Sequence, residues 1–173
     1  MPKVFYLAYG SNLHPLRLQE RVPSARVVGV IELSGYQLVF HKQSNDDSGK
    51  CLLSKTLDIL CKIYVVLYEF DISHKAALDE AEGIGNGYDE ELMSVTLDGS
   101  DYRAYIYMAS ITHINSALIP YTWYKNLVIA GARFHNFPVD YIESIESVPS
   151  REDLNESRQT KNQNLLERMF TYQ

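Results

Sequence analysis

Two short stretches of this sequence hold polar groups in settings that could support catalysis. The first, Tyr9-Gly10-Ser11-Asn12-Leu13, follows an apolar run and precedes a helical pattern. Such a turn exposes backbone N–H groups that can hold a carboxylate or a developing oxyanion, and Gly10 would let a ligand approach closely. The Gly-x-Ser-x-Gly elbow of serine hydrolases is absent, which argues against Ser11 as a nucleophile. An ordinary turn with Ser11 or Asn12 as the helix cap is the alternative, and the local pattern alone favours it.

The second stretch is Leu78-Asp79-Glu80-Ala81-Glu82, at the end of a predicted helix. On that helix Glu82 shares a face with Leu78 and the neighbouring alanines, whereas Glu80 points elsewhere. Desolvation on this apolar face and the charge of Asp79 would both raise the pKa of Glu82. A carboxyl group with a raised pKa can shuttle protons near neutral pH, which makes Glu82 the candidate general acid and base. The alternative is a solvated acidic helix end, which charge runs usually form.

Other familiar kinds of site find no support in the sequence. Gly83-x-Gly85-x-Gly87 follows a predicted helix, whereas a dinucleotide-binding fingerprint follows a strand. Cys51 and Cys61 form no CxxC pair, and the five histidines lack the spacing of a zinc site or a helical metal site. We therefore expect neither a metal ion nor a cofactor.

The charge and hydropathy of the chain limit its partners and its location. The net charge is -6 and no basic run appears, which argues against a nucleic-acid partner. The acidic region 143–156 is interpreted as a solvated face. No apolar run is long enough to span a membrane, and the first residues lead directly into a strand pattern rather than a signal peptide. We expect a cytoplasmic protein with reduced thiols and no membrane partner.

The hydrophobic pattern predicts an α+β fold with a mainly antiparallel sheet, which could close into a barrel, and flanking helices. The predicted strands are Lys3–Tyr9, Ala25–Leu33, Tyr36–His41, Lys62–Phe70, Tyr88–Leu97 and Tyr102–Met108. The predicted helices are His14–Arg21, Ser73–Glu82, Pro120–Phe134 and Pro138–Glu146. Residues 43–50 are predicted to form a surface loop, and residues 52–60 are ambiguous. No linker divides the chain, so we predict one domain over residues 1–148 and a polar C-terminal tail or helix over residues 149–173.

In their order and spacing, these motifs resemble the γ-glutamylcyclotransferase family, in particular its bacterial members. The Tyr9–Leu13 loop matches the family's N-terminal motif, and Leu78-Asp79-x-x-Glu82-Gly83 matches its catalytic-glutamate motif. Further segments with family resemblance are Phe40-His41-Lys42-x-Ser44 with Ser48-Gly49-Lys50, Gly85-Asn86-Gly87-Tyr88, Tyr124 with Gly131-Ala132-Arg133, and Pro138-x-x-Tyr141-Ile142. The resemblance covers roughly Val4 to Ser144. It departs at Asp47, where relatives often have Gly, and over Leu52–Cys61.

The resemblance implies a small α+β domain with a barrel-like core and a reaction that turns a γ-glutamyl amide into 5-oxoproline and a free amine. The substrate's own α-amine attacks its γ-carbonyl, so the reaction needs no cofactor, metal ion or protein nucleophile. Glu82 is then the catalytic proton shuttle. The Tyr9–Leu13 loop binds the substrate, with the Gly10–Leu13 backbone as the cradle for the oxyanion and the α-carboxylate. Tyr88 and Tyr124 are further candidates for substrate binding.

The resemblance also limits the substrate and leaves alternatives open. The glutathione-specific branch of related cyclotransferases usually has Leu at the position of Asn12, so we expect γ-glutamyl amino acids as the small-molecule partner rather than glutathione. A homodimer is left open. Tyr105 and Tyr107 are candidate pocket walls, although plain sheet packing explains them equally well. The alternatives are a cyclotransferase for another γ-glutamylated amine and a catalytically silent small-molecule-binding domain, and an intact Glu82 argues against silence.

Overall fold

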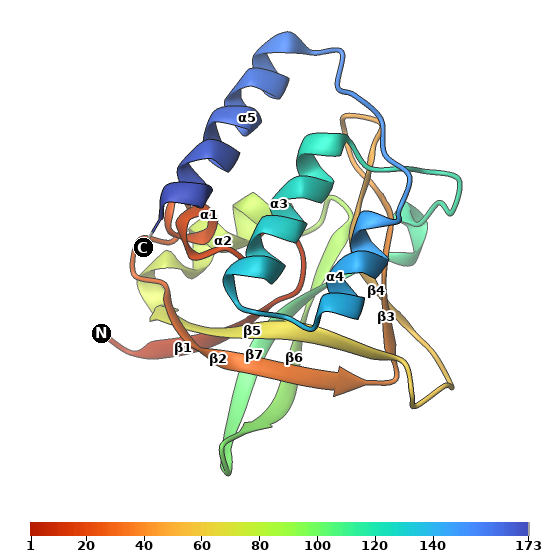
Figure 1. Ribbon diagram of the computed structural model, residues 1–173. Helices are drawn as coiled ribbons and strands as arrows, with labels where there is room; N and C mark the ends of the chain where they lie inside the picture. The colour runs from red at the N-terminus through yellow and green to blue at the C-terminus, as the bar shows by residue number, and fades with distance from the viewer. Residues whose placement is uncertain (173) are drawn as a thin grey trace.

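The computed structural model describes residues 1–172 and consists of a strand-rich core flanked by helices (Figure 1). The strands are β1 (Lys3–Ala8), β2 (Arg26–Ser34), β3 (Tyr36–Gln43), β4 (Gly49–Lys55), β5 (Lys62–Asp71), β6 (Tyr88–Leu97) and β7 (Ser100–Ala109). The α-helices are α1 (Pro15–Gln19), α2 (Lys75–Glu82), α3 (Thr122–Phe134), α4 (Val139–Glu146) and α5 (Glu156–Thr171). Two short 3₁₀ turns, η1 (Ile72–His74) and η2 (Ile111–His113), precede α2 and follow β7.

The main sheet has five strands in the order β2-β5-β1-β7-β6, and β3 and β4 form a separate two-stranded sheet. Only the pairing of β1 with β7 is parallel among the described strands, so the predicted α+β fold with a mainly antiparallel sheet is confirmed. The edge strands β2 and β6 approach each other without pairing: a Cβ at Gly29 would lie 2.7 Å from Leu97 Cδ2. The sheet is therefore curled like a barrel but is not closed by hydrogen bonds.

The centre of the sheet is buried on both faces. Residues 65–68 of β5 are four consecutive buried residues, as expected where both faces of a strand are covered. Tyr6, Leu7 and Ala8 of β1 are buried beside them. Figure 1 shows α3 lying over the sheet, and its apolar face adds Leu127 to the same core. The end of β1, from which the candidate binding loop departs, is thus firmly held.

The strand β4 differs from what the sequence pattern predicts. Residues 43–50 were expected to be a loop and residues 52–60 were ambiguous, but β4 occupies Gly49–Lys55. It pairs antiparallel with β3, with Leu52 opposite Val39 and Leu53 opposite Leu38. The strand β4 was missed because its stability depends on pairing with β3 across a turn, and the hydrophobic pattern of a seven-residue segment does not reveal that pairing.

The C-terminal segment predicted as a polar tail or helix contains α5, a helix of 16 residues. One side of it buries Leu165, Leu166 and Met169 in the core that the sheet and α3 also form. Its last turn lies beside α1, where Arg168 Nη1 is 2.8 Å from Glu20 Oε1 (Figure 1).

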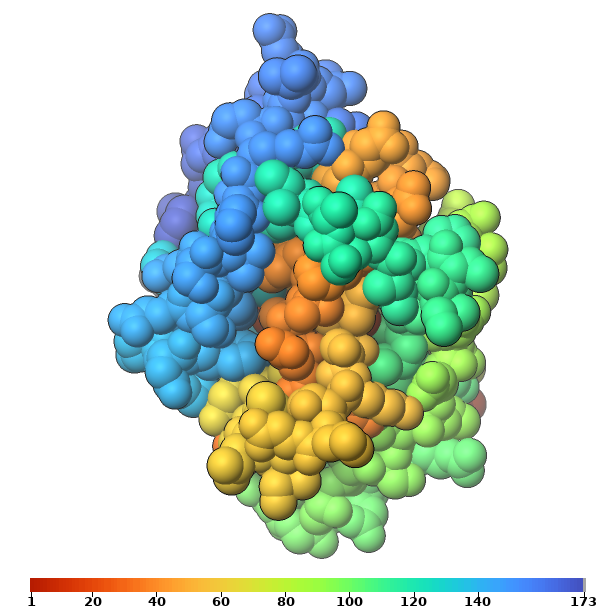
Figure 2. Space-filling model, turned by 90° about the vertical axis from the view of Figure 1, so that its right-hand side faces the viewer, coloured from red at the N-terminus to blue at the C-terminus, as the bar shows by residue number. Residues whose placement is uncertain are grey.

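Figure 2 shows the face of the molecule on which β3 lies in a groove. The groove has a volume of about 490 Å³, and residues of β3, α4 and the segment after η2 line it. The loop between β4 and β5 exposes Leu57, Ile59 and Leu60 near one end of this face. Among residues 1–172, no helix combines the length and the hydrophobicity that crossing a bilayer requires.

Candidate active site

The loop after β1 leads into α1, and the residue that caps this helix is neither Ser11 nor Asn12, the two caps that the alternative interpretation offered. His14 is the N-cap of α1, and its Nδ1 accepts a hydrogen bond from Leu16 N at 3.2 Å. Ser11 and Asn12 are therefore free of a capping role. Leu13 N donates to Gly10 O at 3.1 Å, so this amide is not available to a substrate as the predicted cradle required. The Ser11 and Asn12 amides have no hydrogen-bond acceptor among residues 1–172, which leaves two donors for an anionic group.

The same loop is held in place by hydrogen bonds and packing with residues far away in the sequence. Leu13 O accepts hydrogen bonds from Tyr68 OH at 2.6 Å and from His135 Nε2 at 2.7 Å. The Leu13 side chain is completely buried and lines neither of the cavities described below. Gly131 of α3 packs directly on the loop, since a Cβ there would lie 2.8 Å from His14 N. Leu13 thus anchors the loop in the core rather than facing a ligand.

Glu82 is the last residue of α2, and Gly83 ends the helix in the left-handed conformation with φ of 68°. Leu78, one turn earlier, is buried as predicted, but Ala77 and Ala81 are exposed. The predicted apolar face is therefore narrower than expected, because the helix lies at the surface and Leu78 is its one buried residue.

The Glu82 carboxylate meets the loop directly. Glu82 Oε1 accepts hydrogen bonds from Asn12 Nδ2 at 2.5 Å and from Tyr6 OH at 3.3 Å. The other end of the Asn12 amide is held by Arg21, whose Nη1 donates to Asn12 Oδ1 at 2.8 Å. Two stretches that lie seventy residues apart in the sequence are therefore joined by one side-chain amide.

Burial raises the pKa of the Glu82 carboxyl group above its ordinary value. Arg21 lowers it in part, followed by the hydrogen bond from Tyr6 and the more distant charges of Arg17 and Lys42. Asp79 was predicted to raise the pKa of Glu82 as well, but it is not among the groups that shift this pKa. Asp79 Oδ1 accepts a hydrogen bond from Tyr107 OH at 2.6 Å, and Asp79 also forms an ion pair with Lys75. A carboxyl group with a raised pKa among neutral donors is suited to exchange protons near neutral pH.

Two adjoining cavities meet at Glu82. A small inner cavity of about 30 Å³ is lined by Tyr6, Tyr9, Gly10, Ser11, Asn12, Cys51, Glu82, Tyr88, Tyr107 and Tyr124. An outer cavity of about 360 Å³ shares Ser11, Glu82, Tyr88 and Tyr124 with it. Of the site residues predicted from the sequence, the structure brings together all except Leu13 and the candidate pocket wall Tyr105.

The inner cavity has walls of protonated phenols and one buried thiol. Tyr88 OH donates to Cys51 O at 2.6 Å, and Cys51 N donates to Tyr124 OH at 3.1 Å. Burial raises the pKa of Tyr9, Tyr88 and Tyr124 well above the ordinary value for tyrosine. Burial also raises the pKa of the Cys51 thiol to about 12, so Cys51 is not an activated nucleophile. Among these side chains, Glu82 is the one carboxyl group, and its pKa is raised from the ordinary value towards neutral pH.

The two other tyrosines proposed as pocket walls have different positions. Tyr107 lines the inner cavity, and its ring lies edge-on to that of Tyr6 with centroids 5.7 Å apart. Tyr105 lines neither cavity, and its ring instead faces the Lys75 ammonium at 4.3 Å.

Several residues of the site were not found from the sequence: Tyr6, Arg17, Arg21, Lys42, Lys50, Cys51 and Trp123. Arg17 and Arg21 did carry a signal, because their spacing of four puts both on one face of the predicted helix, although α1 itself ends at Gln19. Lys42 and Lys50 reach the site on the β3–β4 hairpin, whose pairing the sequence did not show. Glu80 was predicted to point elsewhere, yet it lines the outer cavity as an exposed side chain.

Comparisons with known proteins agree with this arrangement. Residues 62–145 match the AIG2-like family. The chain is 27% identical to human γ-glutamylcyclotransferase over 150 residues, covering 83% of this chain and 77% of the relative. The mouse protein of the same name is 27% identical over 155 residues, covering 85% and 79% of the two chains. A solved structure of a γ-glutamyl cyclotransferase superposes with a TM-score of 0.83 at 22% identity, over 96% of this chain and 99% of that one.

In fold and in sequence the chain is similar to the γ-glutamylcyclotransferases, a class of enzymes. The resemblance to the γ-glutamylcyclotransferases that the sequence motifs predict is confirmed by these relatives.

Proposed function

We propose that this enzyme converts a γ-glutamyl amino acid into 5-oxoproline and a free amino acid. The observation that carries the proposal is the contact between Glu82 and Asn12, which sets a carboxyl group of raised pKa beside the loop with free amides. The human and mouse relatives are named for the same chemistry.

In the proposed reaction, the α-amine of the glutamyl group attacks its own γ-carbonyl carbon. A C–N bond forms and closes a five-membered lactam, and the original amide C–N bond breaks. Because the nucleophile is tethered to the electrophile, its effective concentration is high without help from the protein. Two protons leave the attacking nitrogen. One goes to the leaving nitrogen as its bond to carbon breaks, and the other ends on the released amine as its ammonium.

Glu82 is the proposed carrier of these protons. As a carboxylate it takes the first proton from the α-ammonium, which frees the lone pair for attack. As a carboxylic acid it gives a proton to the departing nitrogen. One group serves both steps because its raised pKa brings the two protonation states closer in free energy near neutral pH.

The loop amides are proposed to stabilise the tetrahedral intermediate. The carbonyl oxygen becomes an oxyanion during attack, and the Ser11 and Asn12 N–H groups are two donors without an acceptor inside residues 1–172. The tyrosines of the inner cavity are protonated and fill the inner side of the site, so that little room for water remains behind Glu82.

The experiment that tests the function is release of 5-oxoproline by the purified protein from a panel of γ-glutamyl amino acids, γ-glutamyl amines and glutathione. Turnover of a γ-glutamyl amino acid is the expected result. Turnover of γ-glutamyl amines alone would indicate the alternative leaving group. Binding of γ-glutamyl compounds without any 5-oxoproline would indicate a silent binding domain. Location in the cytoplasm stays a prediction.

A further inference from the structure

The outer cavity is rich in positive charge, although the chain as a whole carries a net charge of -6. Four basic side chains line it, Arg17, Arg21, Lys42 and Lys50, together with the acidic Glu80 and Glu82. Lys50 is neutralised by Asp46 at 2.9 Å. The other three basic side chains form no ion pair with the residues that the structure describes. A cavity of this kind attracts an anionic ligand.

Arg17 has the strongest unmet requirement for such a ligand. Its Nε is buried and has no hydrogen-bond partner among residues 1–172. Burial lowers its pKa to about 10, so the guanidinium is still charged at neutral pH. A buried charged donor without a partner is costly and rare in proteins, and an anionic ligand that accepts its hydrogen bond would remove this cost.

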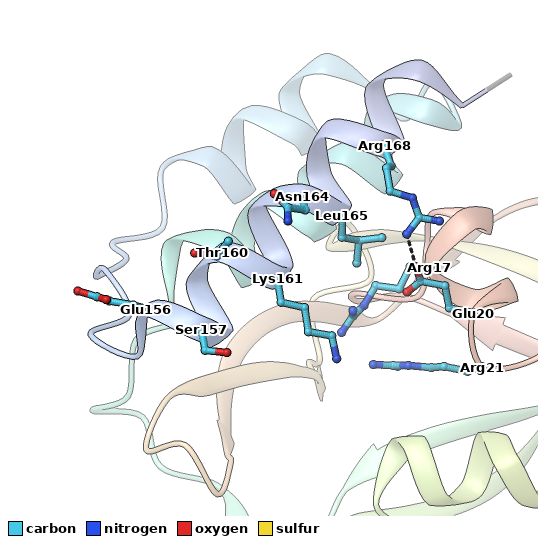
Figure 3. Close-up of a pocket in the computed structure, with 10 residues that line it drawn as sticks. All are labelled: Arg17, Glu20, Arg21, Glu156, Ser157, Thr160, Lys161, Asn164, Leu165 and Arg168. Atoms are coloured by element: carbon cyan, nitrogen blue, oxygen red, sulfur yellow. Dashed lines mark hydrogen bonds and ion pairs between the residues drawn. The ribbon is translucent and has the colours of Figure 1, made fainter.

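Arg17 and Arg21 form the wall between the outer cavity and a larger hollow of about 950 Å³ between α1 and α5. In Figure 3 the side chains of Arg17, Arg21 and Lys161 converge on one space in that hollow. Arg168, further along α5, is occupied by Glu20. Room therefore exists beyond the arginines for a ligand that extends outward from Glu82.

The position of Glu82 decides which half of a γ-glutamyl substrate meets these arginines. The γ-carbonyl must lie beside Glu82, where the two cavities join. An inner cavity of about 30 Å³ holds little more than a water molecule, so both halves of the substrate must extend from Glu82 on its outer side. The glutamyl half is assigned to the Ser11 and Asn12 amides, which leaves the arginines of the outer cavity to the variable leaving half. A leaving amino acid carries a carboxylate within a few bonds of the scissile amide.

We propose that Arg17, with Arg21 beside it, binds a carboxylate on the leaving half of the substrate, an inference that rests on the proposed function. The preferred substrates are then γ-glutamyl amino acids or peptides with an acidic group on the leaving half, and γ-glutamyl alkylamines are poor substrates. An arginine suits this role because its planar donors match a carboxylate.

The test compares two substrates that differ by one carboxylate, γ-glutamyl-alanine and γ-glutamyl-ethylamine. Wild-type kcat/KM is expected to favour γ-glutamyl-alanine by roughly 10- to 100-fold, the usual effect of a hydrogen bond to a charged group. Arg17→Met should reduce this ratio by roughly 10-fold or more, and Arg17→Lys should restore part of it. The ratio is the decisive quantity because Arg17 also influences the pKa of Glu82, which affects both substrates equally.

Arg26→Met is the matched control, because Arg26 is exposed on β2 and lines neither cavity. It should leave the ratio unchanged. Circular dichroism and thermal melts establish that each variant is folded. If Arg17→Met does not fold, Arg21→Met and the wild-type ratio decide the question.

Three results would overturn the inference. A wild-type enzyme without preference for γ-glutamyl-alanine needs no carboxylate site. An equal loss on both substrates in Arg17→Met would place the arginine at the glutamyl half or in a structural role. An unchanged ratio in a folded Arg17→Met would exclude its contact with the leaving half. Absence of 5-oxoproline from both substrates with wild type would instead reject the proposed function itself.

Discussion

A single side-chain amide, that of Asn12, connects the proposed proton carrier with the loop and with Arg21. Its Nδ2 donates to Glu82 and its Oδ1 accepts from Arg21, so the orientation of the amide is fixed by both neighbours. This arrangement orients the Glu82 carboxylate and places the Asn12 amide between that carboxylate and Arg21. A direct ion pair with an arginine would lower the pKa of Glu82 and remove its capacity to exchange protons near neutral pH.

Glu82→Gln should lower kcat by roughly 10²–10⁴, the usual effect of losing a general acid and base. The amide keeps the shape of the side chain but cannot titrate. Rates of 5-oxoproline release check this expectation. Glu80→Gln is a close control, because Glu80 lines the same outer cavity yet makes no hydrogen bond to Asn12 or Tyr6. A wild-type rate in Glu82→Gln, or a dead Glu80→Gln, would contradict the assignment.

The same substitution should affect stability in a direction set by the raised pKa. The folded protein binds the Glu82 proton more tightly than the unfolded chain, so this group stabilises the fold below the ordinary value of about 4.5. That contribution is lost as the pH rises from this value through the raised pKa. Glu82→Gln should therefore melt at the same or a higher temperature than wild type at pH 7, and the difference should shrink towards pH 4.5. A variant that melts clearly lower at neutral pH would contradict this expectation.

Tyr6→Phe should move the acidic limb of the pH profile. Tyr6 OH donates to Glu82 Oε1 and favours its charged form, so removing the hydroxyl raises the pKa of Glu82 further. The acidic inflection of kcat/KM should shift to higher pH, which a pH series of initial rates measures. Tyr64→Phe is the control, because Tyr64 OH binds Glu32 at the surface. A profile that shifts to lower pH in Tyr6→Phe would show that the hydrogen bond has another role.

Among the secondary-structure elements, α3 supports the site through the loop, because Gly131 lets the helix pack against it. Gly131→Ala places a methyl group against Leu13 and His14, whose backbone cannot move without shifting Ser11 and Asn12. Overpacking of this kind costs about 1–3 kcal/mol. Thermal melts should show lower stability, and 5-oxoproline release should fall with it. Arg133→Ala is the control and should change little, because the Arg133 side chain is exposed on the same helix. A Gly131→Ala variant with wild-type stability and activity would show that the loop adapts freely.

The sequence predicted most strands and helices because their signals are local. Alternating or continuous apolar residues marked β5, and Gly83 marked the end of α2. The strand β4 escaped because its pairing with β3 is a property of two segments together. The same reason explains why Lys42 and Lys50 were missed. That the Gly10–Leu13 loop and Glu82 belong to one site was expected from family resemblance alone, since no local pattern connects residues seventy positions apart. The contact between Asn12 and Glu82 itself was not predicted.

On the scale of the whole molecule, the outer cavity is rich in positive charge although the chain carries a net negative charge. The net charge of -6 reflects 22 acidic against 16 basic residues, yet four of the basic ones line one cavity. A local excess of positive charge of this kind draws anionic substrates towards one opening of the molecule. The general location of the site was predictable from motifs, but this charge distribution was not, because it arises from α1 and the β3–β4 hairpin meeting in space.

Treatment with EDTA followed by desalting should leave the rate of 5-oxoproline release unchanged. The attacking amine is part of the substrate, and the proposed mechanism stabilises the oxyanion with backbone amides rather than with a Lewis acid. Rates before and after treatment, in buffers with and without added Mg²⁺ or Zn²⁺, provide the measurement. Activity that EDTA abolishes and a divalent ion restores would contradict the mechanism.

The central position of β1 has a consequence for how the chain is made. β1 leaves the ribosome before the other strands of its sheet, yet its neighbours β5 and β7 begin only at Lys62 and Ser100. The nascent chain must close these long loops before its first strand gains either partner, which makes such folding slow. Until β7 emerges, apolar strand edges are open to other chains and to chaperones. A ribosome that stalls before β7 emerges would therefore hold a chain in which β1 lacks one of its two neighbours.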